Sequence, residues 1–215
     1  MHLYSFSTIP LDTVRGVMLD LDNTLYEYSP CHSAGLSAAF QVYKTKRNID
    51  FDSFMVLYKE AQIHVKISTK GQAASHSRIL YFQHMLEKTE KSTNVHDTLL
   101  LEEVYWNSFM KTMTLKEEAL HFLIECKKRG IMVCIITDLT IQIQLRKIEQ
   151  LEIEEYTQYI VSSEEAGVEK PDQGIFMYAL AKMGIPSNDV IVVGDDEKKD
   201  IDGARRCNIP AYQVI

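Results

Sequence analysis

Residues 14–24 of this chain read VRGVMLDLDNT. The segment from Val14 to Leu21 is apolar, contains β-branched residues and ends in acidic residues, a pattern typical of a buried strand in a parallel sheet. Asp20 and Asp22 are two residues apart, so on an extended backbone their side chains leave the same side, roughly 6–7 Å apart at ~3.3 Å per residue. The segment therefore predicts a central strand that ends in a pair of carboxylates.

The rest of the chain shows two sequence patterns. Residues 27–113 show almost only helical periodicity, which predicts a small helical bundle. From residue 114 onward, helical segments alternate with short apolar runs such as IMVCIIT (131–137) and DVIVVGD (189–195). Strands separated by helices indicate right-handed crossovers and a parallel sheet covered on both faces. We therefore predict an α/β fold: a Rossmann-like, doubly wound parallel-sheet core over residues 1–26 and 114–215, interrupted by the bundle at 27–113.

Composition excludes several classes of protein. The chain has 215 residues and a net charge of −7, which disfavours a passive binder of nucleic acid or of anionic membranes. The apolar run from Ile131 to Ile136 is far shorter than the roughly 20 residues of a membrane span, and the N-terminal sequence lacks a signal-peptide pattern, so we expect a cytoplasmic protein. The four cysteines and seven histidines show no CxxC or HxxxH spacing, which disfavours a disulfide framework or a transition-metal site.

Polar residues gather where the predicted strands end. In a parallel α/β sheet, ligands bind outside the carboxyl ends of the strands. The strand-end positions carry Asp20, Leu21, Asp22, Thr137, Asp138, Asp195 and Asp196, with Lys170 and Asp200 close by. Taken singly, the polar residues of this set are also typical of a turn or a helix N-cap.

This set suits phosphate chemistry. One carboxylate of the Asp20–Asp22 pair can attack phosphorus while the other donates a proton to the leaving oxygen and later accepts one from water. Because several carboxylates would repel a phosphate, we predict a bound Mg²⁺, with Asp195 and Asp200 completing its site. Elsewhere, the hydroxyl of Thr137 and the ammonium of Lys170 could bind phosphate oxygens.

Four motifs occur in order: LDLDNTLY (19–26), IITD (135–138), EKPD (169–172) and VVGDDEKKDIDGA (192–204). In this order they resemble the haloacid dehalogenase superfamily of hydrolases over the whole chain. The resemblance implies that Asp20 is the nucleophile and Asp22 the general acid and base. It also implies phosphate binding by Leu21, Asp22, Thr137, Asp138 and Lys170, and metal binding by the carboxylates of Asp20, Asp195 and Asp200 with the carbonyl of Asp22. Asp138 and Asp196 stand where relatives often have Asn and Ser.

A helical cap between the first and second motifs marks one subgroup of this family, and residues 27–113 fit it. Such caps exclude water and contact the substrate. We nominate Arg78 and Tyr26 as substrate contacts. A solvated charge at Arg78 and a packing role for Tyr26 account for these residues at least as well. With the acidic residue Asp22 two positions after the expected nucleophile, the first motif resembles that of the phosphatases and phosphomutases of the family. We therefore expect a phosphatase, monomeric or homodimeric, of a sugar phosphate, nucleotide or phospho-acid. The alternatives are a phosphomutase, a 2-haloacid dehalogenase-like hydrolase, a receiver-like switch and a non-catalytic phospho-ligand binder.

Overall fold

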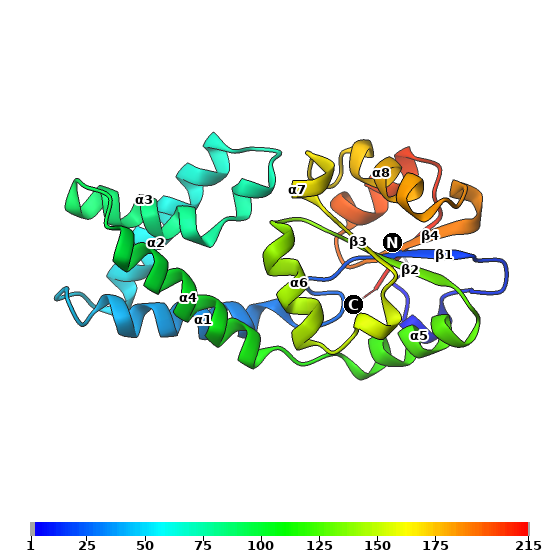
Figure 1. Ribbon diagram of the computed structural model, residues 1–215, viewed down its shortest axis with the longest axis horizontal. Coiled ribbons are helices and arrows are strands. Elements are labelled where there is room, and N and C mark those ends of the chain that lie inside the picture. The colour runs from blue at the N-terminus through cyan, green and yellow to red at the C-terminus, as the bar shows by residue number, and fades with distance from the viewer. Residues whose placement is uncertain (1–2, 215) are drawn as a thin grey trace. The chain divides into compact units, whose positions relative to one another are not determined.

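The computed structural model describes residues 3–214, which fall into two compact units (Figure 1). The first unit runs up to Glu27 and resumes at Thr114, and the second is Tyr28–Met113. The predicted core also included Met1, His2 and Ile215, which lie outside the described residues. Within residues 3–214, no helix is both long enough and apolar enough to cross a membrane.

The first unit contains a five-stranded parallel sheet in the order β3-β2-β1-β4-β5. The central strand is fully buried because every one of its residues is apolar or glycine, as a strand covered on both faces requires. The predicted doubly wound α/β fold is confirmed. The strands are β1 (Gly16–Leu19), β2 (Met132–Thr137), β3 (Tyr159–Ser162), β4 (Val190–Gly194) and β5 (Ala211–Gln213).

Helices cover both faces of this sheet; Figure 1 shows α8 on one face and α5 on the other. The core on the α8 side includes Met18, Ile136 and Phe176, all fully buried. The α-helices of this unit are α5 (Glu117–Lys128), α6 (Ile141–Gln150), α7 (Ser163–Ala166), α8 (Gln173–Met183) and α9 (Asp202–Arg206). The unit also contains the 3₁₀ helices η1 (Phe6–Thr8), η3 (Glu154–Tyr156) and η4 (Ser187–Asp189) and the π-helical turn η5 (Glu197–Ile201).

The register of the sheet brings the strand ends together. Leu19, the last residue of β1, pairs with Ile135 of β2 and Val193 of β4. Because the strands are parallel, the residues that follow them emerge at the same edge. Asp20 therefore lies between the ends of β2 and β4.

The second unit is helical throughout its ordered elements, around an aromatic core. Tyr58, Phe82 and Trp106 are at most 1% exposed. Gly35 lets α1 approach α4, since a Cβ there would lie 2.7 Å from the ring of Tyr105. Its elements are α1 (Tyr28–Tyr43), α2 (Phe51–Ser68), η2 (Ala73–His76), α3 (Arg78–Glu90) and α4 (Val95–Thr112). The assignment of this unit as a substrate-covering cap stays a prediction.

Candidate active site

Three carboxylates meet at the edge of the sheet where β1 and β4 end. Asp20 directly follows β1, Asp195 follows β4, and Asp200 comes from η5. Their carboxylate oxygens lie within 4.8 Å of one another. Gly194 makes this approach possible, because a Cβ at that position would collide with the carboxylate of Asp200. The structure thus brings three of the predicted metal ligands together.

Lys170 joins two of these carboxylates. Its Nζ donates to Oδ1 of Asp20 at 2.6 Å, to Oδ1 of Asp200 at 2.7 Å and to the carbonyl of Ile136 at 3.1 Å. The lysine side chain is only 3% exposed. Burial pulls its pKa down, but Asp20 and Asp200 raise the pKa well above the ordinary lysine value, so the ammonium keeps its charge.

The carboxylates are poorly solvated. Burial raises the pKa of Asp20 to about 7, although Lys170 opposes this, and burial together with Asp20 raises the pKa of Asp195 to about 6. Burial also raises the pKa of Asp200. The cluster offers only oxygen ligands, and the burial and mutual proximity of its carboxyls disfavour their ionised forms. Both properties suit a hard divalent cation such as Mg²⁺. The donor set is therefore compatible with the predicted metal.

Asp22 is held by two residues of the same unit. Nζ of Lys147 donates to its Oδ1 at 2.6 Å, and the hydroxyl of Tyr26 donates to the same oxygen. Lys147 is fully buried, whereas the side chain of Asp22 is 31% exposed. Lys147 is not among the site residues predicted from sequence. The pattern that could have indicated it is its position on an amphipathic helix, on the same face as the buried Ile143 and Ile148.

Thr137 and Asp138 lie at the end of β2 and have different surroundings. The amide of Gln144, on α6, donates to Oγ1 of Thr137 at 2.7 Å and to the carbonyl of Asp138 at 2.5 Å. The carboxylate of Asp138 accepts from the backbone N–H of Lys170 at 3.0 Å and from Nζ of Lys199 at 2.7 Å. The Asp138 side chain therefore anchors the segment that carries Lys170.

Asp196 has a local structural role. Its Oδ1 accepts from the backbone N–H groups of Lys198 and Lys199, at 2.9 and 3.0 Å, and so caps η5. In turn, the N–H of Asp196 donates to Oδ2 of Asp200 at 3.0 Å. Asp196 thereby fixes the turn that presents Asp200.

The nominated contact Arg78 belongs to the second unit and is only 6% exposed. Its guanidinium donates to the hydroxyls of Tyr28 and Tyr105 and to the carbonyl of His76, and lies 5.2 Å from the Trp106 ring. No carboxylate pairs with it among residues 3–214. The alternative explanation of a solvated charge does not hold, because aromatic rings and hydroxyls enclose the guanidinium, and the role of Arg78 as a substrate contact stays a prediction.

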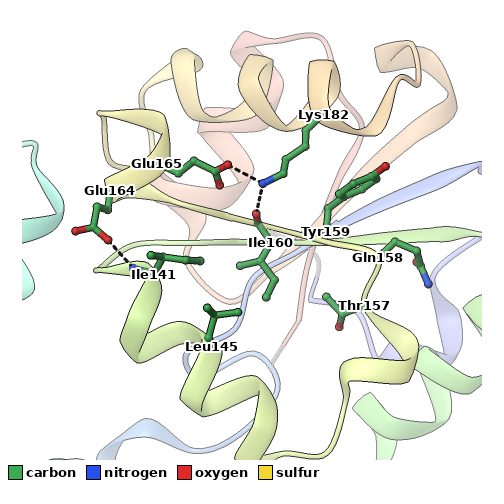
Figure 2. Close-up of a pocket in the computed structure, with 9 residues that line it drawn as sticks. All are labelled: Ile141, Leu145, Thr157, Gln158, Tyr159, Ile160, Glu164, Glu165 and Lys182. Carbon is green, nitrogen blue, oxygen red and sulfur yellow. Dashed lines mark hydrogen bonds and ion pairs between the residues drawn. The ribbon is translucent and has the colours of Figure 1, made fainter.

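A separate hollow of about 680 Å³ lies beside β3, one of the two edge strands of the sheet (Figure 2). Tyr159 and Leu145 line it, as do Lys182 and Glu165, whose Nζ and Oε1 lie 2.7 Å apart. None of the strand-end carboxylates contributes to its lining. This hollow is therefore distinct from the candidate active site.

The model of the haloacid dehalogenase-like hydrolase family matches residues 14–208, so the chain belongs to that family. It is 39% identical over 189 residues to the ribulose-1,5-bisphosphate 5-phosphatase of Halopiger xanaduensis, covering 87% of this chain and 79% of that one. It is 27% identical to the glyceraldehyde 3-phosphate phosphatase of Methanocaldococcus jannaschii, covering 94% and 85%. The crystal structure of a HAD phosphatase from Thermococcus onnurineus superposes with a TM-score of 0.71 at 18% identity, covering 94% of this chain and 86% of the other. The predicted family is confirmed, and these sequence relatives are phosphatases, in agreement with the predicted reaction class.

Proposed function

We propose that this chain hydrolyses phosphoric monoesters of small metabolites, with Asp20 as the nucleophile. One observation carries the proposal: a buried carboxylate, an ammonium group 2.6 Å from it and two further carboxylates converge at the carboxyl edge of the sheet. The relatives' phosphatase activity supports the same reaction class.

The reaction would proceed in two steps. In the first, a carboxylate oxygen of Asp20 bonds to phosphorus, the ester P–O bond breaks, and Asp22 gives its proton to the leaving oxygen. In the second, a water oxygen bonds to phosphorus while Asp22 takes the water's proton, and the bond between Asp20 and phosphorus breaks. Asp20 and Asp22 end the cycle as they began it.

Phosphate would be bound by residues at the ends of β1 and β2. Lys170 offers its ammonium. Thr137 offers its hydroxyl proton, because Gln144 already donates to Oγ1 and the contact of the hydroxyl with the carbonyl of Asp138 is long, at 3.5 Å. We assign Leu21, Asp22 and Asp138 to phosphate binding as well. For Asp138 the backbone N–H is the suitable group, because its carboxylate would repel phosphate.

We propose Mg²⁺ as the cofactor, held by the carboxylates of Asp20, Asp195 and Asp200 and by the carbonyl of Asp22. When bound, the cation neutralises charge that builds up on the transferring phosphoryl group. The carboxylate cluster is the observation that supports this assignment.

For the substrate we favour a phosphorylated sugar, because the relatives act on ribulose-1,5-bisphosphate and glyceraldehyde 3-phosphate. Arg78 is proposed to bind an anionic group of the substrate, since it is a buried cation without a carboxylate partner in the described part of the chain. Tyr26 stays a predicted contact, and its hydroxyl donates to Asp22. A cap role for residues 27–113, a cytoplasmic location and a monomeric or homodimeric state belong to the same proposal.

The test is a screen of phosphate release from phosphorylated metabolites with Mg²⁺, including ribulose-1,5-bisphosphate, glyceraldehyde 3-phosphate and p-nitrophenyl phosphate. Asp20→Asn should abolish turnover and leave the circular dichroism spectrum unchanged. Asp12→Asn is the matched control, because the Asp12 side chain is 90% exposed and should not affect turnover. Mg²⁺-dependent turnover by Asp20→Asn, or turnover of chloroacetate but of no phosphate ester, would contradict the proposal.

A further inference from the structure

Helix α6 places two fully buried polar side chains against the candidate site. Gln144 and Lys147 are both 0% exposed and, three residues apart, lie on the same face of the helix. Gln144 donates to Thr137, and Lys147 donates to Asp22. One helix therefore contacts two residues that the proposed reaction uses.

Burying Lys147 is costly for the fold. Removing an ammonium group from water costs several kcal/mol, and a well-packed apolar residue of similar volume is often neutral or stabilising in such a position. Lys147 pairs with Asp22, whose side chain is 31% exposed, and its Nζ lies 5.9 Å from the centre of the Tyr26 ring. The pair therefore joins a buried cation to a carboxylate that stays accessible, an arrangement better suited to function than to stability.

Two donors to Asp22 converge on one of its carboxylate oxygens. Lys147 and Tyr26 both donate to Oδ1. A carboxylate oxygen that accepts from an ammonium and a hydroxyl at once is a poor site for a further proton. We propose that Lys147 is a positioning residue that holds Asp22 by Oδ1, so that Oδ2 carries the transferred proton.

This inference rests on the proposed function and assigns its proton transfer to one atom. As the ester P–O bond breaks, the proton on Oδ2 of Asp22 moves to the leaving oxygen; as water attacks the phosphorylated Asp20, a water proton moves to the same Oδ2. An alkoxide leaves poorly without a proton, whereas p-nitrophenolate leaves without one. Loss of Lys147 should therefore affect esters of alcohols far more than esters of p-nitrophenol.

The experiment compares wild type with Lys147→Met on glycerol 2-phosphate and p-nitrophenyl phosphate, in the presence of Mg²⁺. On glycerol 2-phosphate, kcat/KM should fall about 100-fold, the lower end of what a positioned general acid contributes. On p-nitrophenyl phosphate, kcat/KM should stay close to the wild-type value. There kcat should fall and a burst of p-nitrophenol should appear, because the second step still needs Asp22 as the base.

Three further variants separate positioning from folding. Lys182→Met removes a lysine whose ion pair with Glu165 lies in the same unit but outside the site, and should keep wild-type kinetics on both esters. Tyr26→Phe removes only the second donor to Oδ1 and should show the same selectivity for the alkyl ester, with a smaller loss. In an Asp22→Asn background, adding Lys147→Met should change kcat/KM by no more than about twofold, because the two residues act as one unit.

Equal losses of kcat/KM on both esters for Lys147→Met and Tyr26→Phe, or no loss on either, would overturn the inference. A full 100-fold further loss in the Asp22→Asn background would overturn it as well. A wild-type protein that hydrolyses neither ester would refute the proposed function itself, whereas wild-type turnover with unselective variants would refute only the role of Lys147.

Discussion

Replacing Lys170 by methionine should lower the free energy of unfolding of the metal-free protein by about 3–5 kcal/mol at pH 8, the usual loss when one partner of a buried ion pair is removed. The Nζ of Lys170 lies 2.6 Å from Asp20 and 2.7 Å from Asp200. The side chains of the two carboxylates are only 7% and 1% exposed. Methionine keeps most of the aliphatic stem, so the loss is electrostatic: two buried carboxylates are left without their cation.

The loss should shrink at lower pH. Burial raises the pKa of Asp20 to about 7, from an ordinary value of 3.8. A carboxyl with a raised pKa binds more protons in the folded than in the unfolded state between these two values, so stability falls as pH rises through this interval. Without Lys170 the pKa of Asp20 should rise further. The variant should therefore lose much less stability at pH 5.5, where protonation removes the unpaired charge.

Urea unfolding followed by circular dichroism, with a chelator present at pH 5.5 and at pH 8, measures both effects. Lys182→Met is the matched control: it removes an ion pair whose two side chains are each 30% exposed, and should cost no more than about 1 kcal/mol at either pH. Lys170 is not the counter-ion that the geometry indicates if the free energy of unfolding of Lys170→Met lies within about 1 kcal/mol of the wild-type value at pH 8. The same conclusion follows if the variant loses equal free energy of unfolding at both pH values.

Three other changes test the site. Mg²⁺ at 100 times the dissociation constant that it has at pH 8 should stabilise the protein by about 2.7 kcal/mol at that pH. The same concentration should stabilise it less at pH 5.5, because protons compete for carboxylates such as Asp195, whose pKa burial raises to about 6; equal shifts in melting temperature would contradict this. Gly194→Ala should displace Asp200 and raise the Mg²⁺ concentration for half-maximal activity about 10- to 100-fold, and an unchanged titration would refute the packing argument. Arg78→Met should raise KM for ribulose-1,5-bisphosphate at least about tenfold, the loss of one charged hydrogen bond, with little change for p-nitrophenyl phosphate; equal changes for both would count against a substrate contact.

The sheet and its carboxylate cluster could be predicted from sequence because both depend on short-range patterns. A buried apolar strand shows in its composition, and parallel strands end at one edge whatever their order. Asp20, Asp195 and Asp200 each follow such a strand closely, so their convergence needs no knowledge of side-chain packing. Their catalytic and metal-binding roles stay predictions.

The pairing of Lys147 with Asp22 could not be predicted in the same way. The two residues are 125 positions apart, and the pair forms only because α6 packs with its Gln144–Lys147 face toward the strand ends. The period of a helix shows which residues share a face, but the rotation of that face against the sheet depends on how side chains pack. The burial of Arg78 depends on tertiary packing as well, since rings from α1, α3 and α4 enclose it.

Lysines lie around the strand ends, and they bear on how an acidic protein would bind the phosphate group that we propose as its substrate. Apart from Asp196, whose carboxylate caps η5, five carboxylates occur there, and three ammonium groups pair with four of them. The carboxylates are on Asp20, Asp22, Asp138, Asp195 and Asp200, and the ammonium groups are on Lys147, Lys170 and Lys199. With these five carboxylates ionised, five negative and three positive charges leave two negative charges, which one divalent cation cancels. A dianionic phosphate would meet net repulsion at the metal-free cluster and none once the cation is bound. We therefore expect substrate binding, and not only the chemical step, to depend on Mg²⁺.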